Sequence, residues 1–261
     1  MSTAPSETEI EQSSQEEVRD YYHRILPFFE EELRGRGDEA FWTRLAGEPP
    51  GCRVLEIGAG TGRATEFLAS AASRVVAFDL SPELIAQARR RLAGLSHVAC
   101  LAADMRDIAL GACFDLVVAV DDPFVHLTED GDRDRALAAV ARHLAPGGRF
   151  VLEAAWFPPE DRQEAAGELV RERSTENSSL RVRETWRCDP ATRLCTARFE
   201  YRRHGRLEGQ ASFPGRLWSV EELEARARDA GLRLTHLWGD YDRSPWERST
   251  SPRLLAELRP A

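Results

Sequence analysis

Residues 54–63, which read Val-Leu-Glu-Ile-Gly-Ala-Gly-Thr-Gly-Arg, restrict the fold more than any other part of the chain. A short apolar run passes directly into a glycine-dense turn and then into a helix start, which is the order of a nucleotide-type cofactor site. Gly58, Gly60 and Gly62 follow the spacing G-x-G-x-G, whereas the dinucleotide fingerprint has its third glycine one position later, where this chain has Arg63. The spacing therefore favours an adenosine-bearing cofactor other than a dinucleotide.

Apolar segments alternate with amphipathic segments through residues 51–157, which we interpret as the cofactor-binding core. Ser81 followed by Pro82 and Glu83 is a good N-terminal start for one of the helices. The alternation predicts an α/β fold with a parallel sheet covered by helices on both faces. The predicted strands are residues 53–57, 74–79, 97–102, 114–120 and 149–155, and the predicted helices are residues 62–71, 82–93 and 128–144.

The segments outside this core have different patterns. Residues 1–17 are polar and acidic with hardly any apolar residue, which predicts a disordered tail. Residues 18–50 carry apolar residues at helical spacing, and we expect one or two helices over the active site. In residues 158–217 the apolar period becomes two, which predicts an antiparallel β lid of three strands inserted after the fifth strand. Residues 218–261 supply a further helix and the last two core strands.

Charge and hydropathy exclude several classes of protein. A formal net charge of -9 argues against a protein that binds nucleic acid through its phosphates. No apolar run approaches the roughly 18 residues that span a bilayer, and the acidic N-terminus does not resemble a signal peptide. We therefore expect a cytoplasmic protein without a membrane segment. The basic residues are all arginine, which suits a GC-rich bacterial genome.

The five cysteines do not form a metal-binding or disulfide pattern. Cys52, Cys100, Cys113, Cys188 and Cys195 are widely spaced, odd in number and lack a C-x-x-C pair. Cys188 and Cys195 could face each other across a hairpin, but free thiols are the preferred interpretation. No metal ion is expected.

Polar residues at the ends of the predicted strands are the first candidates for chemistry. Asp79 ends the second strand about 20 residues past the glycines, where an acid accepts hydrogen bonds from ribose hydroxyls; capping of the next helix is the alternative. Asp121 and Asp122 end the fourth strand, where ligands bind in open α/β sheets. His126 follows, and an imidazole with a pKa near neutrality could take a proton from an amine or hydroxyl. A packing or capping role for His126 is equally open.

Five ordered motifs resemble those of the class I S-adenosylmethionine (SAM)-dependent methyltransferases. They are residues 55–63 (LEIGAGTGR), 78–82 (FDLSP), 103–107 (ADMRD), 114–118 (FDLVV) and 144–149 (LAPGGR). The resemblance implies a seven-stranded Rossmann-like methyltransferase sheet with SAM as the cofactor. It places an acid near the methionine part of SAM, and an acid with its next residue at the adenine ring, although a solvated turn could explain the latter pair. The implied cofactor site is Glu56, Gly58, Ala59, Gly60, Asp79, Leu80, Asp104, Met105 and Asp121.

A narrower resemblance concerns the acceptor side. Residues 103–107, 125–127 and 153–158 resemble the aminosugar N,N-dimethyltransferases of macrolide biosynthesis, and this implies Tyr21 and His126 at the acceptor. The antiparallel segment and residues 239–255 resemble methyltransferases that modify the N-terminal amine of ribosomal peptide natural products. Packing in the core is the alternative role for the tyrosines. The predicted substrate pocket is Tyr22, Asp122, Phe124 and Trp156.

We therefore expect a SAM-dependent methyltransferase that methylates an amine of a small-molecule natural product or its precursor, with a hydroxyl less favoured. One alternative is methylation of the N-terminal amine of a ribosomally made peptide. Two others are a non-catalytic SAM-fold scaffold or regulator and an NAD-dependent oxidoreductase. The antiparallel lid could also serve as a homodimer interface.

Overall fold

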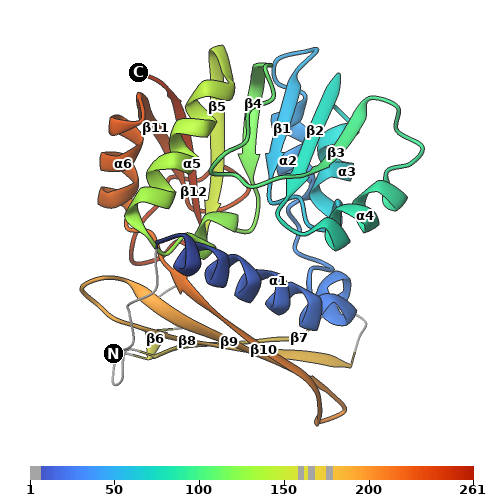
Figure 1. Ribbon diagram of the computed structural model, residues 1–261, viewed down its shortest axis with the longest axis vertical. Coiled ribbons are helices and arrows are strands. Elements are labelled where there is room, and N and C mark those ends of the chain that lie inside the picture. The colour runs from blue at the N-terminus through green and yellow to red at the C-terminus, as the bar shows by residue number, and fades with distance from the viewer. Residues whose placement is uncertain (1–6, 158–161, 164–167, 175–178) are drawn as a thin grey trace. The chain divides into compact units, whose positions relative to one another are not determined.

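The computed structural model describes residues 7–157, 162–163, 168–174 and 179–261, and the chain forms two compact units (Figure 1). Unit 1 joins Met1–Gly35 to Gln163–Gly215, and unit 2 joins Arg36–Arg162 to Arg216–Ala261. Each unit has its own sheet. In the part of the chain that is described, no helix is long and apolar enough to cross a membrane.

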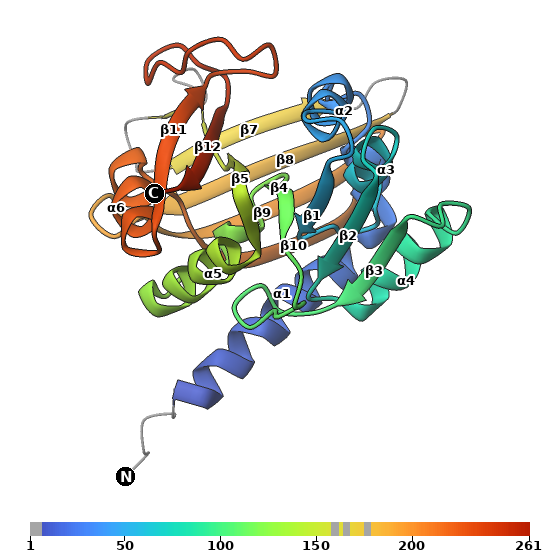
Figure 2. The ribbon, with the colours of Figure 1, turned by 90° about the horizontal axis from the view of Figure 1, so that it is seen from above.

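Unit 2 contains the predicted seven-stranded sheet, in the order β11-β12-β5-β4-β1-β2-β3 (Figure 2). Strands β1 to β5 pair in parallel, whereas β12 is antiparallel to both of its neighbours. Their carboxyl ends therefore meet at one edge of the sheet. The strands are β1 (Arg53–Ile57), β2 (Arg74–Asp79), β3 (Val98–Ala102), β4 (Phe114–Ala119), β5 (Leu144–Ala154), β11 (Leu232–Trp238) and β12 (Leu254–Pro260).

Helices cover both faces of this sheet because successive strand residues are apolar and point to opposite sides. On β1, Val54 belongs to a core cluster with residues of α2 (Glu39–Ala46) and α3 (Arg63–Ala69). Its neighbour Leu55 belongs to a second cluster with α5 (Asp130–His143) and α6 (Val220–Asp229). Figure 2 shows the two helix pairs on opposite sides. The remaining helical segments of this unit are α4 (Pro82–Arg91) and the 3₁₀ turn η1 (Pro123–His126).

Unit 1 consists of α1 (Glu7–Glu32) and a five-stranded sheet in the order β10-β9-β8-β7-β6. Helix α1 packs on one face, where Phe28 stacks on Tyr201 with ring centroids 4.6 Å apart. A Cβ atom added at Gly209 would lie 2.5 Å from the Phe28 ring, so only glycine admits this contact. The strands are β6 (Arg162–Gln163), β7 (Glu168–Ser174), β8 (Leu180–Cys188), β9 (Leu194–Arg203) and β10 (Arg206–Arg216).

Two boundaries differ from the prediction. Helix α1 begins at Glu7, whereas the polar composition of residues 7–17 predicts disorder; residues 1–6 lie outside the described part. The antiparallel segment has two more strands, β6 and β7, than the period-two pattern indicates. In addition, α1 joins the antiparallel sheet in unit 1, while α2 joins unit 2. A polar helix and a two-residue strand carry no clear apolar period, which is why composition alone missed them.

The preference for free thiols is wrong at one pair. Cys188 and Cys195 lie directly opposite each other in the β8–β9 pairing and form a disulfide. Facing residues of an antiparallel pair point to the same side of the sheet, so this register brings the two sulfurs together. Cys52, Cys100 and Cys113 are free.

Candidate functional site

The glycine loop between β1 and α3 is held by contacts that exclude side chains. Gly58 has a φ of +70°, and a Cβ atom there would lie 2.5 Å from the Cβ atom of Pro123. Gly60 has a φ of +55° and donates its N–H to Asp79 Oδ2 at 2.9 Å. L side chains rarely adopt these backbone angles, so the loop conformation favours glycine at both positions, and at Gly58 the contact with Pro123 also excludes a side chain. Ala59 between them donates its N–H to the carbonyl oxygen of Phe78 on β2.

Asp79 connects this loop to the end of β2. Its Oδ1 accepts a hydrogen bond from the backbone N–H of Ser81 at 2.9 Å, and Ser81 caps α4 by accepting from the N–H of Leu84. The capping alternative is therefore part of its role. The two carboxylate oxygens have about four acceptor positions between them, so the N–H groups of Gly60, Leu80 and Ser81 leave acceptor capacity for a ribose hydroxyl. Burial raises the pKa of Asp79 although backbone N–H groups oppose this.

Glu56 lies on β1 one residue before the strand end and is buried. Its Oε2 accepts a hydrogen bond from the Thr65 hydroxyl on α3 at 2.5 Å. Because burial disfavours the carboxylate, the pKa of Glu56 rises to about 8. The side chain is thus mostly protonated near neutral pH.

At the end of β3, Asp104 is paired with an arginine that the sequence motifs did not single out. Arg106 donates Nη2 to Asp104 Oδ2 at 2.7 Å and Nη1 to Asp132 Oδ2 at 2.6 Å. Burial alone would raise the pKa of Asp104, but hydrogen bonds from Arg106 lower it overall, so the group stays charged. Met105 packs against the apolar core. The Asp-x-Arg spacing was the available signal for Arg106.

Two consecutive aspartates turn the chain at the end of β4. Asp121 has a φ of 61° and Asp122 a φ of 45°, and left-handed residues other than glycine often mark functional sites. Asp122 is buried, and its Oδ2 accepts from the N–H of Ala155 at 2.8 Å. Burial raises the pKa of Asp122 to about 7. Phe124 is fully buried in the core against Phe150, which argues against its predicted place in a pocket wall.

Arg36 is the main residue that sequence reasoning missed. Its Nη1 donates to Asp121 Oδ1 at 2.7 Å, and its Nη2 donates to Glu153 Oε1 at 2.9 Å. The Tyr241 hydroxyl donates to the same Glu153 oxygen at 2.7 Å, and Arg253 Nη1 lies 3.5 Å from it. Burial alone would lower the pKa of Arg36, but the carboxylates of Asp121 and Glu153 raise it above its usual range. Arg36 stands alone between Gly35 and Gly37, outside any apolar repeat, so the sequence pattern did not indicate its role.

One donor of this arginine is unused within the described residues. Arg36 Nε is buried without a hydrogen-bond partner there, and Asp38 Oδ2 lies 3.9 Å away. Asp38 is itself bound by both Nη atoms of Arg63, at 2.8 and 2.7 Å. Arg63 follows the last glycine of the loop, so these pairs join the glycine loop to the ends of β4 and β5.

The remaining predicted residues fall in both units. His126 ends η1 in unit 2, and burial lowers its pKa to about 4, with only partial opposition from Asp121. Trp156 donates the N–H of Nε1 to the carbonyl oxygen of Ser251 at 2.9 Å.

Tyr21 is buried in unit 1, where its ring packs edge-on against Tyr22 and Phe213. Both tyrosines pack against aromatic rings of unit 1, which agrees with the packing alternative, and their place at the acceptor stays a prediction. Leu80, also a predicted cofactor residue, is half-buried between β2 and α4. Among the described residues no group of acids, histidines and cysteines has a metal-binding arrangement.

Comparison with known proteins identifies the family. A methyltransferase-domain family model matches residues 54–148. The chain is 30% identical over 207 residues to a cypemycin N-terminal methyltransferase from Streptomyces, covering 78% of this chain and 82% of that protein. The chain belongs to the SAM-dependent methyltransferases.

Other relatives of this methyltransferase extend the comparison. It is 36% identical over 112 residues to dTDP-3-amino-3,6-dideoxy-alpha-D-glucopyranose N,N-dimethyltransferase of Streptomyces fradiae, covering 42% of each chain. Among solved structures, the CcbJ methyltransferase of Streptomyces caelestis matches with a TM-score of 0.75 at 22% identity, over 95% of this chain and 98% of that one. A SAM-bound amino pentose methyltransferase of Micromonospora echinaspora matches with a TM-score of 0.65 at 22% identity, over 100% and 99%. These structures share the fold.

The residues of unit 2 fit SAM in three respects. The loop around Gly60 presents backbone without a side chain, Asp79 keeps lone pairs for hydroxyl donors, and the buried Arg36 Nε is a donor suited to a carboxylate. When bound, SAM supplies an electrophilic methyl group on a sulfonium. The chain's own contribution is to hold and align the reactants, because alignment in a near-attack geometry lowers the barrier of a displacement.

Proposed function

We propose that this enzyme transfers a methyl group from SAM to an amine nitrogen of a natural product or its precursor. The observation that carries this proposal is the set of relatives. The cypemycin enzyme is named as an N-terminal methyltransferase, and the Streptomyces fradiae enzyme as an N,N-dimethyltransferase of an amino sugar. Both names describe methylation at nitrogen.

The electrostatics at the end of β4 support an amine acceptor. An amine arrives mainly as an ammonium ion near neutral pH. The side chain of Asp121 is 50% exposed, and its carboxylate would attract that cation. The amine must lose a proton before its lone pair can attack, so a group that orients the neutral amine is useful.

His126 is better suited to orienting the acceptor amine than to removing its proton. Because its pKa is lowered to about 4, the imidazole is neutral and can accept a hydrogen bond from an N–H. Taking a proton from an alkylammonium of pKa near 10 would be uphill by roughly six pKa units, or about 8 kcal/mol. We therefore propose that His126 positions the deprotonated amine, which modifies the expectation of a general base.

Methylation of a peptide N-terminus is the second candidate. The match to the cypemycin enzyme spans 78% of this chain, whereas the amino-sugar match spans 42%. The longer match extends well beyond the cofactor-binding residues. A peptide with a free N-terminal amine is therefore included in the test.

The test is methyl transfer measured by mass spectrometry with the full chain, SAM and two acceptor sets. One set contains amino sugars and the other contains short peptides with free N-termini, each with its N-acetylated counterpart as a matched control. We expect S-adenosylhomocysteine and the mass gain of one or more methyl groups only with free amines. Equal methylation of acetylated acceptors would refute nitrogen as the target, and SAM binding without turnover on any acceptor would favour a scaffold.

The role of His126 is tested with His126→Ala and His126→Gln. We expect the alanine variant to lose roughly tenfold in kcat, and the glutamine variant to keep most activity because its side-chain carbonyl oxygen accepts the same hydrogen bond. Equal loss in both variants, together with a pH–rate inflection that disappears in both, would instead indicate a general base.

A further inference from the structure

The face of the five-stranded sheet opposite α1 carries a concentration of arginines. Along β8 the buried residues Leu180, Val182 and Trp186 alternate with outward ones, and β9 alternates in the same way. The outward positions of β8 are Arg181, Arg183, Thr185 and Arg187, and those of β9 are Thr196, Arg198, Glu200 and Arg202.

The register leaves this positive charge incompletely balanced. Arg181 lies directly opposite Arg202, a like-charged pair that destabilises a sheet unless something compensates it. Glu200 is shared, at 3.1 Å from Arg198 and 3.2 Å from Arg202. On the neighbouring strand β7, Glu172 Oε1 lies 4.0 Å from Arg183 Nε. The outward positions of β8 and β9 therefore hold five arginines and one glutamate, and the register sets Glu168 and Glu172 of β7 opposite Arg187 and Arg183, in a chain whose net charge is -9.

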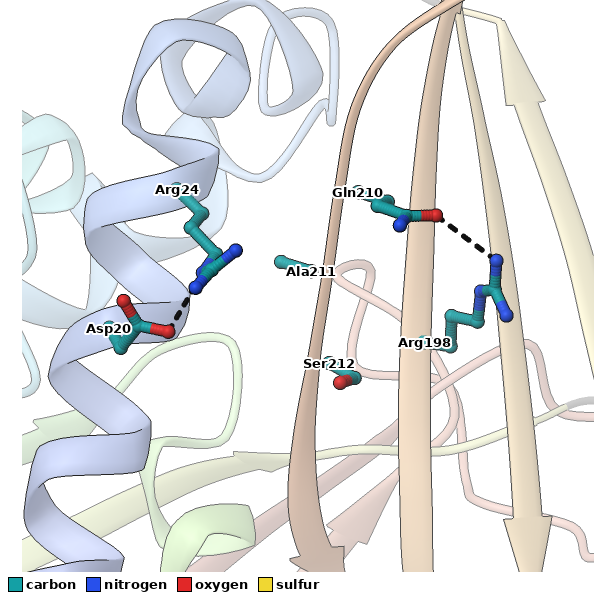
Figure 3. Close-up of a pocket in the computed structure, with 6 residues that line it drawn as sticks. All are labelled: Asp20, Arg24, Arg198, Gln210, Ala211 and Ser212. Carbon is teal, nitrogen blue, oxygen red and sulfur yellow. Dashed lines mark hydrogen bonds and ion pairs between the residues drawn. The ribbon is translucent and has the colours of Figure 1, made fainter.

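A pocket lies at the edge of this arginine face. It has a volume of about 370 Å³ and is lined by Asp20, Arg24, Arg198, Gln210, Ala211 and Ser212 (Figure 3). Figure 3 shows Arg24 with Asp20 on α1 to one side of β10, and Arg198 with Gln210 to the other. Arg24 Nε donates to Asp20 at 2.7 Å, and Arg198 Nη2 donates to the Gln210 carbonyl at 3.1 Å. Arg198 belongs to both features, so the pocket adjoins the arginine face at β10, while Asp20 and Arg24 line it from α1 on the other side of that strand.

The edge strand adds hydrogen-bonding capacity beside the pocket. Strand β10 is at the end of the described sheet order, so alternate backbone N–H and C=O groups of this strand have no neighbouring strand. Pro214 lies within β10, and proline is tolerated there because an edge strand does not need every N–H. Residues 210–212, which line the pocket, keep their N–H groups.

We propose that the arginine face binds an acidic peptide segment in an extended conformation, with one end of that segment in the pocket. Alternate side chains of an extended strand are separated by roughly 6.6 to 6.8 Å. A peptide with a carboxylate at every second residue therefore matches the spacing of Arg181 and Arg183 along β8. Ser212 and Gln210 offer hydrogen bonds to a polar peptide end.

This assignment is more specific than a general attraction to anions. A second copy of the chain, placed face to face on the same surface, would bring five arginines against five. A long nucleic acid would extend beyond the face over a protein of net charge -9, which would repel it. A short acidic peptide covers only the arginine face. Since every residue that carries the proposal lies in unit 1, it does not depend on the acceptor assigned to the enzyme.

The test is fluorescence anisotropy of the full chain with a labelled eight-residue peptide that alternates Glu and Ser. Two control peptides have the four Glu residues in one block or replaced by Gln. The variant is Arg181→Gln/Arg198→Gln/Arg202→Gln, and the matched control is Arg90→Gln/Arg233→Gln, which changes exposed arginines of unit 2. We expect the triple variant to bind at least about tenfold more weakly, the control variant to bind like the unchanged protein, and added salt to weaken binding.

Circular dichroism and thermal unfolding of each variant separate lost binding from lost folding. If the triple variant is unfolded, the single variant Arg181→Gln, whose side chain makes no described ion pair, gives the answer on its own. Unchanged affinity in a folded variant would overturn the proposal. So would equal binding of the Gln peptide, equal binding of the block peptide, tighter binding of single-stranded DNA, or a dimer that dissociates when these arginines are replaced.

Discussion

Replacing Glu56 with glutamine should remove most of one pH-dependent contribution to stability. Glu56 is 1% exposed and lies on β1, and its pKa rises from an ordinary 4.5 to about 8 because burial disfavours its charged form. The folded state therefore holds this proton at pH values where the unfolded state has released it. Stability from this group is fully present below about pH 4.5 and is lost as the pH rises towards 8.

The size of the effect follows from these two pKa values. Each pH unit between them lowers the free energy of unfolding by about 1.4 kcal/mol. The slope is smaller near each pKa, where the group is partly protonated, so the interval from pH 5 to pH 8 costs about 3.5 kcal/mol. Glutamine has nearly the same shape, does not titrate, and can accept the hydrogen bond from the Thr65 hydroxyl with its carbonyl oxygen. The variant should therefore fold and lack this dependence.

The assay is urea unfolding of both proteins without SAM at several pH values from 5 to 8.5. The difference between them isolates Glu56, because Asp122 and His126 titrate in this range or just below it and are common to both. We expect the unfolding free energy of the unchanged protein to fall relative to Glu56→Gln by about 3 to 4 kcal/mol. Parallel curves over the whole interval would refute the buried, protonated Glu56.

Three further predictions concern the cofactor site and the disulfide. Asp79→Ala should weaken SAM binding in calorimetry by about 1.5 to 3 kcal/mol through lost ribose hydrogen bonds, and unaltered affinity would remove Asp79 from the site. Arg36→Lys keeps the charge beside Asp121 and Glu153 but loses the Nε donor, so SAM affinity should fall by roughly tenfold; exposed Arg233→Lys is the control. Alkylation of the denatured protein should modify three cysteines without reduction and five after it, because the Cys188–Cys195 pair is oxidised. Five modified cysteines without reduction would show a reduced pair, as expected in a cytoplasm.

The sheet of unit 2 could be predicted from sequence because its pattern is local and repeated. Strands buried on both faces read as continuous apolar runs, and β1, β2 and β4 are each followed by a helical segment, with a visible start at Ser81-Pro82 after β2. The seven-stranded sheet follows from the resemblance to the methyltransferases, and the structure confirms it. The antiparallel segment was predicted less completely, because β7 contains a run of alternating charges with few apolar residues.

The cofactor-side positions were predictable for the same reason, since Gly60 and Asp79 lie at fixed distances from the strand ends. Their electrostatic state was not. The sequence gives no sign that Glu56 is protonated or that His126 has a pKa near 4, because both follow from how many atoms surround the side chain after folding. A prediction of a base at neutral pH therefore needed the three-dimensional environment.

The contacts of Arg36 could not be predicted from a local sequence pattern, because its partners come from distant parts of the chain. Its partners Asp121, Glu153 and Tyr241 are 85, 117 and 205 residues away. The side chain is 11% exposed, and an arginine is buried to this extent only when carboxylates surround it. Removing the arginine alone would take a cationic partner from both Asp121 and Glu153, while Glu153, itself 6% exposed, would keep the Tyr241 hydroxyl and Arg253 beside it. Arg36 therefore links the ends of β4 and β5 by charge in addition to the pairing of the sheet, and a change to Arg36, Asp121 or Glu153 should be read with the other two in place.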